Sequence, residues 1–252
     1  MKEESERIAS LIDSLNHPDK KVIRQAADAL ISLAPDFPQL TERLNRLLGE
    51  SPPDKSWPVA YVLAHISSPS STCLHVLSET LGSKDPDIRW AVGLLLVRLG
   101  RSDRAAVELL LDLLKSGTPT QRRMALYCLR DINLKDTVVL RAFLEMLRDL
   151  DPLVRVAAVT SLKIRTDVGK DGLDHLLDLF LRDPDSRVRH TAALALAQLG
   201  APTREIRSAL EEASRSEDAQ LKKAAGAALQ LLQKKGPHHP PNKLAAGGPS
   251  VN

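Results

Sequence analysis

Residues 85–100 read Asp-Pro-Asp-Ile-Arg-Trp-Ala-Val-Gly-Leu-Leu-Leu-Val-Arg-Leu-Gly, a stretch that carries both a helix start and a buried helix face. Asp85 can accept a hydrogen bond from a free N–H of the first helical turn. Pro86 suits that turn because its missing N–H would have had no partner. Val92, Leu96 and Leu99 follow at spacings of four and three, which places them on one side of a helix. The stretch therefore predicts a capped helix with one buried face.

The same pattern recurs along the chain at a step of 33 residues, and once of 34. The column aligned with Leu96 is leucine seven times: Leu30, Leu63, Leu96, Leu129, Leu162, Leu196 and Leu229. Four residues earlier stand small or β-branched apolar residues that let two helices approach closely: Ala26, Val59, Val92, Ala125, Ala158, Ala192 and Ala225. Eleven residues earlier, six of the seven positions hold good N-cap residues: Asp19, Asp85, Thr118, Asp151, Asp185 and Asp218. A fixed step over seven units predicts tandem structural repeats.

Each repeat also contains another apolar segment at helical spacing, which precedes the capped helix in the sequence. Examples lie at residues 8–15, 109–114 and 173–180. The sequence therefore predicts an all-α fold, an α-solenoid or superhelix of about seven helix pairs, over residues 1–233. Residues 234–252 are rich in Gly and Pro and are expected to form a disordered C-terminal tail.

Composition agrees with a helical protein that works in the cytoplasm. Only 3% of the residues are aromatic, so the core must be built from Leu, Ile, Val and Ala. A net charge of +3 does not by itself indicate a nucleic-acid or membrane partner. Cys73 and Cys128 lie in apolar stretches and are expected to be reduced, buried thiols. The charged N-terminus has no signal-peptide pattern, and no apolar run is long enough to cross a membrane, so we expect no membrane partner.

Residues 85–100, 151–155 and 183–200 resemble HEAT repeats, and more narrowly the short HEAT-like repeats first named for phycobilisome lyases. The resemblance covers roughly residues 1–233. It implies an armadillo-like helical fold, in which the first helix of each pair lines the convex surface and the second lines the concave one. The second repeat departs from the family, because Ser56 replaces an arginine and Pro58 comes early. We expect its second helix to start late or to be distorted.

The sequence contains no motif of known catalytic chemistry. It has no Gly-rich phosphate loop, no HExxH, no CxxC and no GxSxG. Deoxyhypusine hydroxylase is similar in architecture but needs His-Glu pairs to hold iron, and none of the seven histidines here is followed by Glu. His238 and His239 in the tail are more simply read as solvated side chains than as metal ligands. We therefore expect no enzyme activity, no cofactor and no metal site.

Two further columns leave alternatives open. Seven residues before the leucine column stand mostly cations: Arg89, Arg122, Arg155, Arg189 and Lys222, with Ile23 and Ser56 as exceptions. These arginines could pair with the Asp column of neighbouring repeats, since guanidinium groups bind carboxylates in a bidentate manner. They could instead form a stripe that binds phosphates.

The positions six and two residues before each column leucine lie opposite the buried face, and every Trp and Tyr of the chain falls there. Trp, Tyr and Arg are enriched at binding hot spots, and exposed aromatic patches mark interaction sites. We therefore predict a partner-binding groove on the concave surface, with these residues: Trp57, Tyr61, Trp90, Arg98, Arg123, Tyr127 and Arg130. The alternative is that neighbouring helices of a tightly curved solenoid bury the rings.

These observations favour a non-catalytic scaffold that binds a protein or peptide, best an acidic one with apolar anchors, in its concave groove. A nucleic-acid-binding solenoid is the first alternative, because aromatic side chains could stack on bases. A lyase-like subunit that acts on a partner protein is the second. The sequence does not identify the partner or the oligomeric state.

Overall fold

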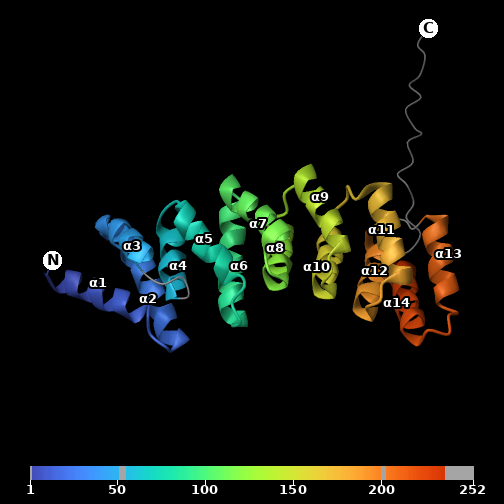
Figure 1. The fold of residues 1–252 in the computed structure, drawn as a ribbon, viewed down its shortest axis with the longest axis horizontal. Coiled ribbons are helices and arrows are strands. Elements are labelled where there is room, and N and C mark those ends of the chain that lie inside the picture. Colours follow the sequence, from blue (N-terminus) through green and yellow to red (C-terminus); the bar gives the residue numbers. More distant parts are fainter. Residues whose placement is uncertain (1, 51–54, 200–202, 236–252) are drawn as a thin grey trace, which may run out of the picture. The chain divides into compact units, whose positions relative to one another are not determined.

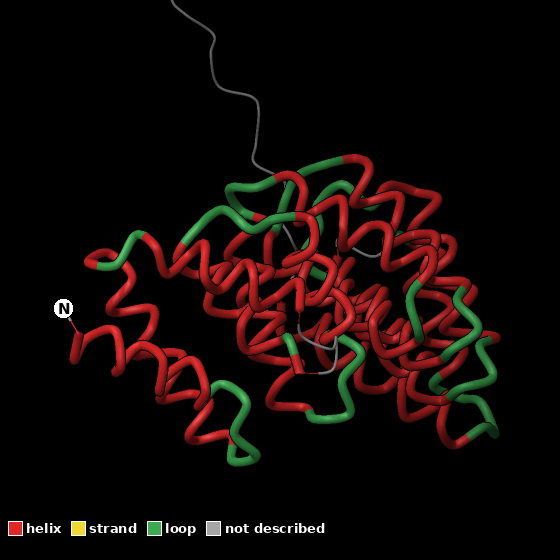
Figure 2. Tube along the Cα trace, turned by 60° about the vertical axis from the view of Figure 1, so that its left-hand side comes forward, coloured by secondary structure: helices red, strands yellow, loops and turns green. Residues whose placement is uncertain are grey.

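The computed structural model describes residues 2–50, 55–199 and 203–235, and in these it contains α-helices, short 3-10 helices and loops but no strand (Figures 1 and 2). The fourteen α-helices form seven consecutive pairs, which confirms the predicted all-α solenoid. The pairs are α1 (Lys2–Ser14) and α2 (Lys20–Leu33); α3 (Gln39–Glu50) and α4 (Trp57–Ile66); α5 (Ser71–Thr80) and α6 (Pro86–Gly100); α7 (Arg104–Ser116) and α8 (Pro119–Ile132); α9 (Thr137–Glu145) and α10 (Pro152–Leu162); α11 (Gly169–Arg182) and α12 (Ser186–Leu199); and α13 (Arg204–Ala213) and α14 (Ala219–Lys235). Two single-turn 3-10 helices, η1 (Ala34–Asp36) and η3 (Met146–Arg148), extend α2 and α9.

The chain divides into two compact units, one ending at Ser161 and the other beginning at Leu162. Within the first unit, the second helices of successive pairs pack in the order α2, α4, α6 and α8. The first helices of successive pairs pack against one another in a second row, in the order α3, α5, α7 and α9. Within the second unit, α12 packs against both α11 and α14. Helices α2 to α8, α12 and α14 thus each contact the other helix of their own pair and a helix of a neighbouring repeat, as stacked repeats do.

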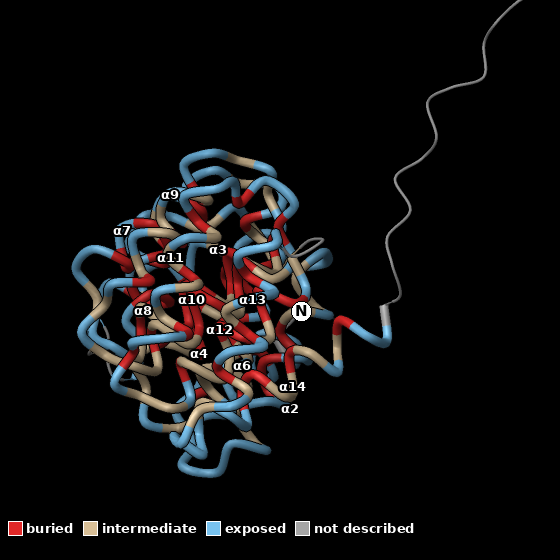
Figure 3. Tube along the Cα trace, turned by 90° about the vertical axis from the view of Figure 1, so that its right-hand side faces the viewer, coloured by how far each residue is buried: buried red, intermediate tan, exposed pale blue. Residues whose placement is uncertain are grey.

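Burial follows the predicted columns, with buried and exposed residues alternating around the helices (Figure 3). Every residue of the small column is buried, from Ala26 at 2% exposure to Ala225 at 0%. The leucines from Leu30 to Leu196 are no more than 1% exposed, and Leu229 is half-buried. Complete burial of a leucine contributes about 1.5–3 kcal/mol. This column is therefore the main apolar spine of each unit.

The predicted N-caps are confirmed. In each of the six predicted positions, the side-chain oxygen accepts a backbone N–H two or three residues further on: Asp19, Asp85, Thr118, Asp151, Asp185 and Asp218. Thr118 also exchanges bonds with Gln121 in a capping box. These side-chain hydrogen bonds therefore fix where the second helix of each of these repeats begins.

The second repeat is irregular, as expected from Ser56 and Pro58. Its helix α4 begins at Trp57, and the equivalent helix α6 begins at Pro86, 29 residues later instead of 33. Lys20 at the start of α2 reaches past α4 to the start of α6, where its Nζ lies 2.9 Å from Asp85 Oδ2 and 2.6 Å from Asp87 Oδ2. The pKa of Lys20 is raised to about 12, first by Asp87 and then by Asp85.

One position of the core holds a charged residue. Three residues after each column leucine stands an apolar residue, except at Arg165, where the sequence offers the neighbouring Ile164 as a replacement. The structure contradicts this replacement, because Arg165 is buried at 6% exposure while Ile164 is 50% exposed. The Arg165 guanidinium binds Asp167 with two hydrogen bonds, Nε to Oδ1 at 2.8 Å and Nη2 to Oδ2 at 2.6 Å. A neutralised arginine can occupy the column, because its charge and its N–H groups are paired.

None of the described helices is long and apolar enough to span a bilayer. Helix α14 continues to Lys235, two residues into the predicted tail. The disorder predicted for the tail falls on residues 236–252, which lie outside the described residues.

Candidate partner-binding surface

The predicted groove residues come from three neighbouring helices, α4, α6 and α8, all within the first unit. Helix α6 packs against both α4 and α8. Hydrogen bonds between these helices join residues about one repeat apart, Arg98 to Ala64 at 2.8 Å and Cys128 Sγ to the Gly93 carbonyl at 3.6 Å. The helices therefore lie side by side in repeat register. We call the following six residues, which occupy equivalent positions on them, the aromatic face: Trp57, Tyr61, Trp90, Leu94, Arg123 and Tyr127.

No residue of the aromatic face is buried. Trp90 is 50% exposed and Leu94 is 63% exposed, and they stand one turn apart on α6. Trp57, Tyr61 and Tyr127 are half-buried. The helical phase deduced from the sequence is thus confirmed, since these positions point away from the buried columns. Leu94 was not among the predicted site residues, although it stands in the same sequence column as the two tyrosines; its exposure alone identifies it.

Arg98 continues the line of Trp90 and Leu94 along α6. Its Nη2 donates to the Ala64 carbonyl in the last turn of α4, at 2.8 Å. This acceptor is neutral, and no carboxylate of the described residues forms an ion pair with Arg98. The guanidinium is held in place, but its charge is available to a partner.

On α4, Tyr61 and His65 pack together, with ring centroids 4.4 Å apart. His65 Nδ1 lies 2.8 Å from the Tyr61 carbonyl oxygen. Burial lowers the pKa of His65 and nearby Arg98 lowers it further, while the Tyr61 carbonyl and Asp28 act in the opposite direction. Burial raises the pKa of Tyr61. Both groups are therefore uncharged at neutral pH, and they extend the apolar part of the surface.

On α8, Arg130 lies over the Tyr127 ring, with its Cζ 5.1 Å from the ring centroid. Its Nε also lies 2.7 Å from Asp131 Oδ1, so its charge is neutralised. Arg123 stands one turn before Tyr127, is half-buried, and forms no ion pair among the described residues. The structure thus separates the three predicted arginines: Arg98 and Arg123 carry unneutralised charge, whereas Arg130 mainly supports Tyr127.

The arginine column seven residues before the leucines has a structural role. Arg89, Arg122, Arg155 and Arg189 each donate a hydrogen bond from Nη1 to a carbonyl in the loop that precedes their own helix. Arg122 and Arg189 also bind carboxylates of the following repeat, Asp149 and Asp218. These contacts direct the guanidinium groups to backbone and carboxylate oxygens, although the buried Nε of Arg189 has no hydrogen-bond partner in the described part of the chain. They favour a ladder of arginine–carboxylate pairs between repeats over a stripe that binds phosphates.

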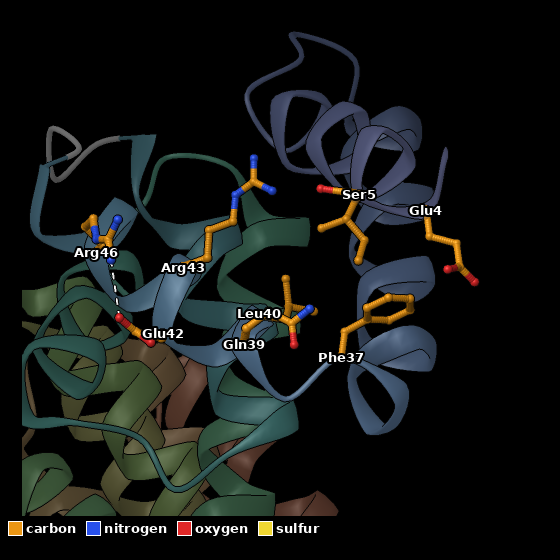
Figure 4. A pocket seen from close by; sticks show the side chains of 9 residues that line it. Glu4, Ser5, Phe37, Gln39, Leu40, Glu42, Arg43 and Arg46 are labelled. Atoms are coloured by element: carbon orange, nitrogen blue, oxygen red, sulfur yellow. Dashed lines mark hydrogen bonds and ion pairs between the residues drawn. The ribbon is translucent and has the colours of Figure 1, made fainter. Parts of the chain in front are cut away.

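A hollow of about 320 Å³ lies elsewhere, between α1 and α3 (Figure 4). Ile8, Phe37 and Leu40 form its apolar part, and Arg46 Nη2 lies 3.3 Å from Glu42 Oε1 at its rim. None of the predicted groove residues lines it. Its rim is mixed in charge, and its walls hold no arrangement of nucleophile and base.

The described part of the chain holds candidate metal ligands and both thiols. No cluster of three His, Cys, Asp or Glu side chains there could hold a metal ion. Cys73 and Cys128 are both buried and unpaired with each other. Burial raises the pKa of Cys73 to about 11 and that of Cys128 to about 12.

Three overlapping segments of the chain match the family described as HEAT repeats, at residues 40–130, 107–197 and 140–230. Together these segments cover residues 40–230, which is most of the chain. No curated protein matches the sequence.

Several solved structures are similar in fold. An engineered protein is 19% identical over 91% of this chain and 98% of its own, with a TM-score of 0.46. A designed armadillo repeat protein in complex with the peptide (KR)4 is 16% identical over 89% of this chain and 99% of its own, with a TM-score of 0.44. Human deoxyhypusine hydroxylase in complex with glycerol is 17% identical over 90% of this chain and 84% of its own, with a TM-score of 0.42. At these identities the likeness concerns the fold alone.

Proposed function

The chain belongs to the HEAT-repeat family, and we propose that it is a non-catalytic scaffold that binds a protein or peptide on its aromatic face. The observation that carries the proposal is the exposure of two large apolar side chains, Trp90 at 50% and Leu94 at 63%, side by side on α6. Contiguous exposed apolar residues mark interaction surfaces more often than isolated ones do. Covering both side chains would contribute on the order of 2 kcal/mol to binding.

The flanking helices support this proposal. Tyr61 on α4 and Tyr127 on α8 occupy the same repeat position as Leu94, one on each side. Tyrosine offers a large contact area at a low cost in side-chain entropy. Contacts with His65 and Arg130 orient the two rings. A partner would therefore meet a surface whose side chains are already positioned, which lowers the entropy lost on binding.

The test is an affinity pull-down from a cytoplasmic extract, which compares the wild type with a Trp57→Ala, Trp90→Ala double variant. We expect a bound protein that the variant loses while its helical circular dichroism stays unchanged. Leu150→Ala is the matched control, because Leu150 is 96% exposed but lies outside the aromatic face. An identical set of bound proteins for wild type and double variant would exclude the aromatic face as the binding surface.

Nucleic-acid binding is the second candidate, and the aromatic rings are the observation that favours it. Against it, the arginine column is occupied by loop carbonyls and carboxylates. Binding of single-stranded or duplex DNA that weakens steeply with salt would support this alternative. A lyase-like role and the short repeat subtype rest on the resemblance of residues 85–100, 151–155 and 183–200 to such repeats, and both stay predictions. The cytoplasmic location stays a prediction.

A further inference from the structure

We infer that the partner segment is an acidic peptide in which an apolar side chain lies between two carboxylates. The inference rests on the proposed function, because it names the chemistry of the partner that the aromatic face would hold. It comes from the arrangement of Trp90, Leu94, Arg98 and Arg123.

The first step is the layout of this surface. Trp90, Leu94 and Arg98 succeed one another at intervals of four residues along α6. At a rise of 1.5 Å per residue, Trp90 and Arg98 are about 12 Å apart along the helix, with Leu94 midway. Arg123 holds the position on α8 that Trp90 holds on α6, and the two helices pack in repeat register. An apolar centre is therefore bracketed by one cation at each end.

The second step is the state of the charges. Four arginines lie on this surface or at its border, Arg24, Arg98, Arg123 and Arg130, together with two aspartates, Asp28 and Asp131. The aspartates lie nearest to the outer arginines: Arg24 Nε is 3.9 Å from Asp28, and Arg130 Nε is 2.7 Å from Asp131. Arg98 and Arg123 have no such partner among the described residues. The uncompensated charge therefore resides on the two arginines that bracket the apolar centre.

The third step is the spacing that a ligand must match. Arg123 lies on the neighbouring helix, so the separation of about 8–10 Å between packed helices adds to the axial offset and gives a span of about 15 Å between the two arginines. An extended peptide rises about 3.3 Å per residue, so two carboxylates that match this span stand about four to five residues apart. A residue between them would place an apolar side chain over Leu94 and Trp90. Guanidinium groups can bind carboxylates through two parallel hydrogen bonds, which adds geometric specificity to the charge attraction.

A nucleic-acid strand fits this layout less well. In duplex DNA, each strand carries a phosphate about every 3.4 Å along the helix axis. Between Arg98 and Arg123 the surface offers instead an aliphatic side chain and rings. An acidic peptide with one apolar anchor matches both the sparse cations and the apolar centre.

The experiment selects ligands for the full chain from a phage-displayed library of random peptides of about twelve residues. We expect enrichment of peptides with Asp or Glu on both sides of a large apolar residue. Selection against the variant Arg98→Glu, Arg123→Glu should instead enrich Lys or Arg at these places. The matched control is Arg43→Glu, Arg141→Glu, the same charge change on exposed arginines of α3 and α9, which should select the same peptides as the wild type.

The affinity of the best acidic peptide is then measured by fluorescence polarisation. We expect at least a tenfold loss for Arg98→Glu, Arg123→Glu and less than a twofold loss for the control pair. Peptides that depend on Trp90 but show no acidic preference, or no response to charge reversal, would overturn the inference and leave the proposed function standing. If no peptide is enriched and the pull-down is also insensitive to Trp57→Ala, Trp90→Ala, both fail. Binding of a 20-nucleotide single strand that is lost on the same charge reversal would overturn the inference in favour of nucleic acid.

Discussion

Arg122 and Asp149 form a bidentate ion pair between the fourth and fifth helix pairs. Nε lies 2.7 Å from Oδ2, and Nη2 lies 2.9 Å from Oδ1. The side chains are 19% and 6% exposed, so the pair is largely shielded from water. The third guanidinium donor, Nη1, closes the loop before α8 by binding the Gly117 carbonyl at 2.7 Å. One arginine therefore fixes both its own loop and the spacing to the next repeat.

Loss of the Asp149 carboxylate should destabilise the first unit. Asp149→Ala leaves a half-buried guanidinium without its counter-charge and also removes an acceptor for the Asp151 N–H, which lies 2.8 Å away. Removing one partner from a shielded ion pair costs about 3 kcal/mol. Urea unfolding followed by circular dichroism would measure the loss.

The control for this experiment is Glu42→Ala, which breaks the exposed Arg46–Glu42 pair. Exposed pairs of this kind contribute about 0.5 kcal/mol or less. Equal losses for the two variants would mean that Asp149 contributes no more than a surface carboxylate.

The arginine–carboxylate pairs between repeats show which contacts could be predicted from the sequence. The arginine column and the N-cap column were both visible as residues at a fixed step, and the pair of Arg189 with Asp218 is the one that the columns predicted. Asp149 was not singled out, although it stands thirteen residues before Leu162 in a column that also holds Ser83, Asp183 and Ser216. Each of these side chains accepts the backbone N–H of the N-cap residue two positions later. The role of Asp149 depends on the loop after η3, which brings its carboxylate to Arg122. Sequence periodicity predicts which residues occupy equivalent positions. Whether two of them form an ion pair, as Arg122 and Asp149 do, depends on the conformation of the loop between them.

Arg165 provides a second stability test. It occupies an apolar column position at 6% exposure, and its charge is neutralised by Asp167, whose side chain is 45% exposed. Arg165→Leu restores the apolar residue of the column and leaves Asp167 able to reach water. Arg165→Ala removes the same charge and leaves a cavity. We expect Arg165→Leu to be the more stable of the two by about 2 kcal/mol, measured by urea unfolding. A stability ranking in the opposite order would show that the column position requires the arginine.

The two cysteines should be unreactive in the folded protein. Their pKa values are raised by burial to about 11 and about 12, and the thiolate is the reactive form. At pH 8, a thiol-specific chromogenic disulfide should label neither Cys73 nor Cys128 on the scale of minutes. In guanidinium chloride both should react at once. Rapid labelling of the native protein would mean that α5 or α8 opens readily.

Acid should weaken the second unit partly through Asp185. The Arg187 guanidinium, at 2.6 Å, holds the pKa of this carboxyl near 2, below its usual 3.8, with help from the Arg187 backbone N–H. A lowered folded-state pKa adds stability above the unfolded-state value, and this stability is lost as the pH falls through about 2. Asp185→Asn keeps the N-cap but not the charge. The stability difference between wild type and variant should therefore be full above about pH 4 and vanish near pH 2, in unfolding titrations at each pH.

The sequence predicted on which side of the helices the aromatic face lies, but not how far its side chains are buried. The step of 33 residues and the helical period placed Trp90 and Leu94 opposite the buried columns, where the structure has them. The half-burial of Trp57, Tyr61 and Tyr127 depends on how closely α4, α6 and α8 approach one another, which the period does not encode. Arg130 pairs with Asp131, its neighbour in the sequence, and this pairing depends on side-chain conformations that the period does not encode either.

Side chains kept for binding should be dispensable for folding, and Trp90 and Leu94 allow this to be tested. Trp90→Ala and Leu94→Ser remove apolar groups that are 50% and 63% exposed. Surface substitutions away from caps and ion pairs usually change stability by no more than about 0.5 kcal/mol. We expect values near this limit for both variants, measured by urea unfolding. The reference variant is Leu96→Ala, two residues beyond Leu94 on the opposite, buried side of α6 at 0% exposure, which should lose about 3 kcal/mol. If Trp90→Ala destabilised the protein as much as Leu96→Ala, Trp90 would be a structural residue, and the aromatic face would lose its main support as a binding surface.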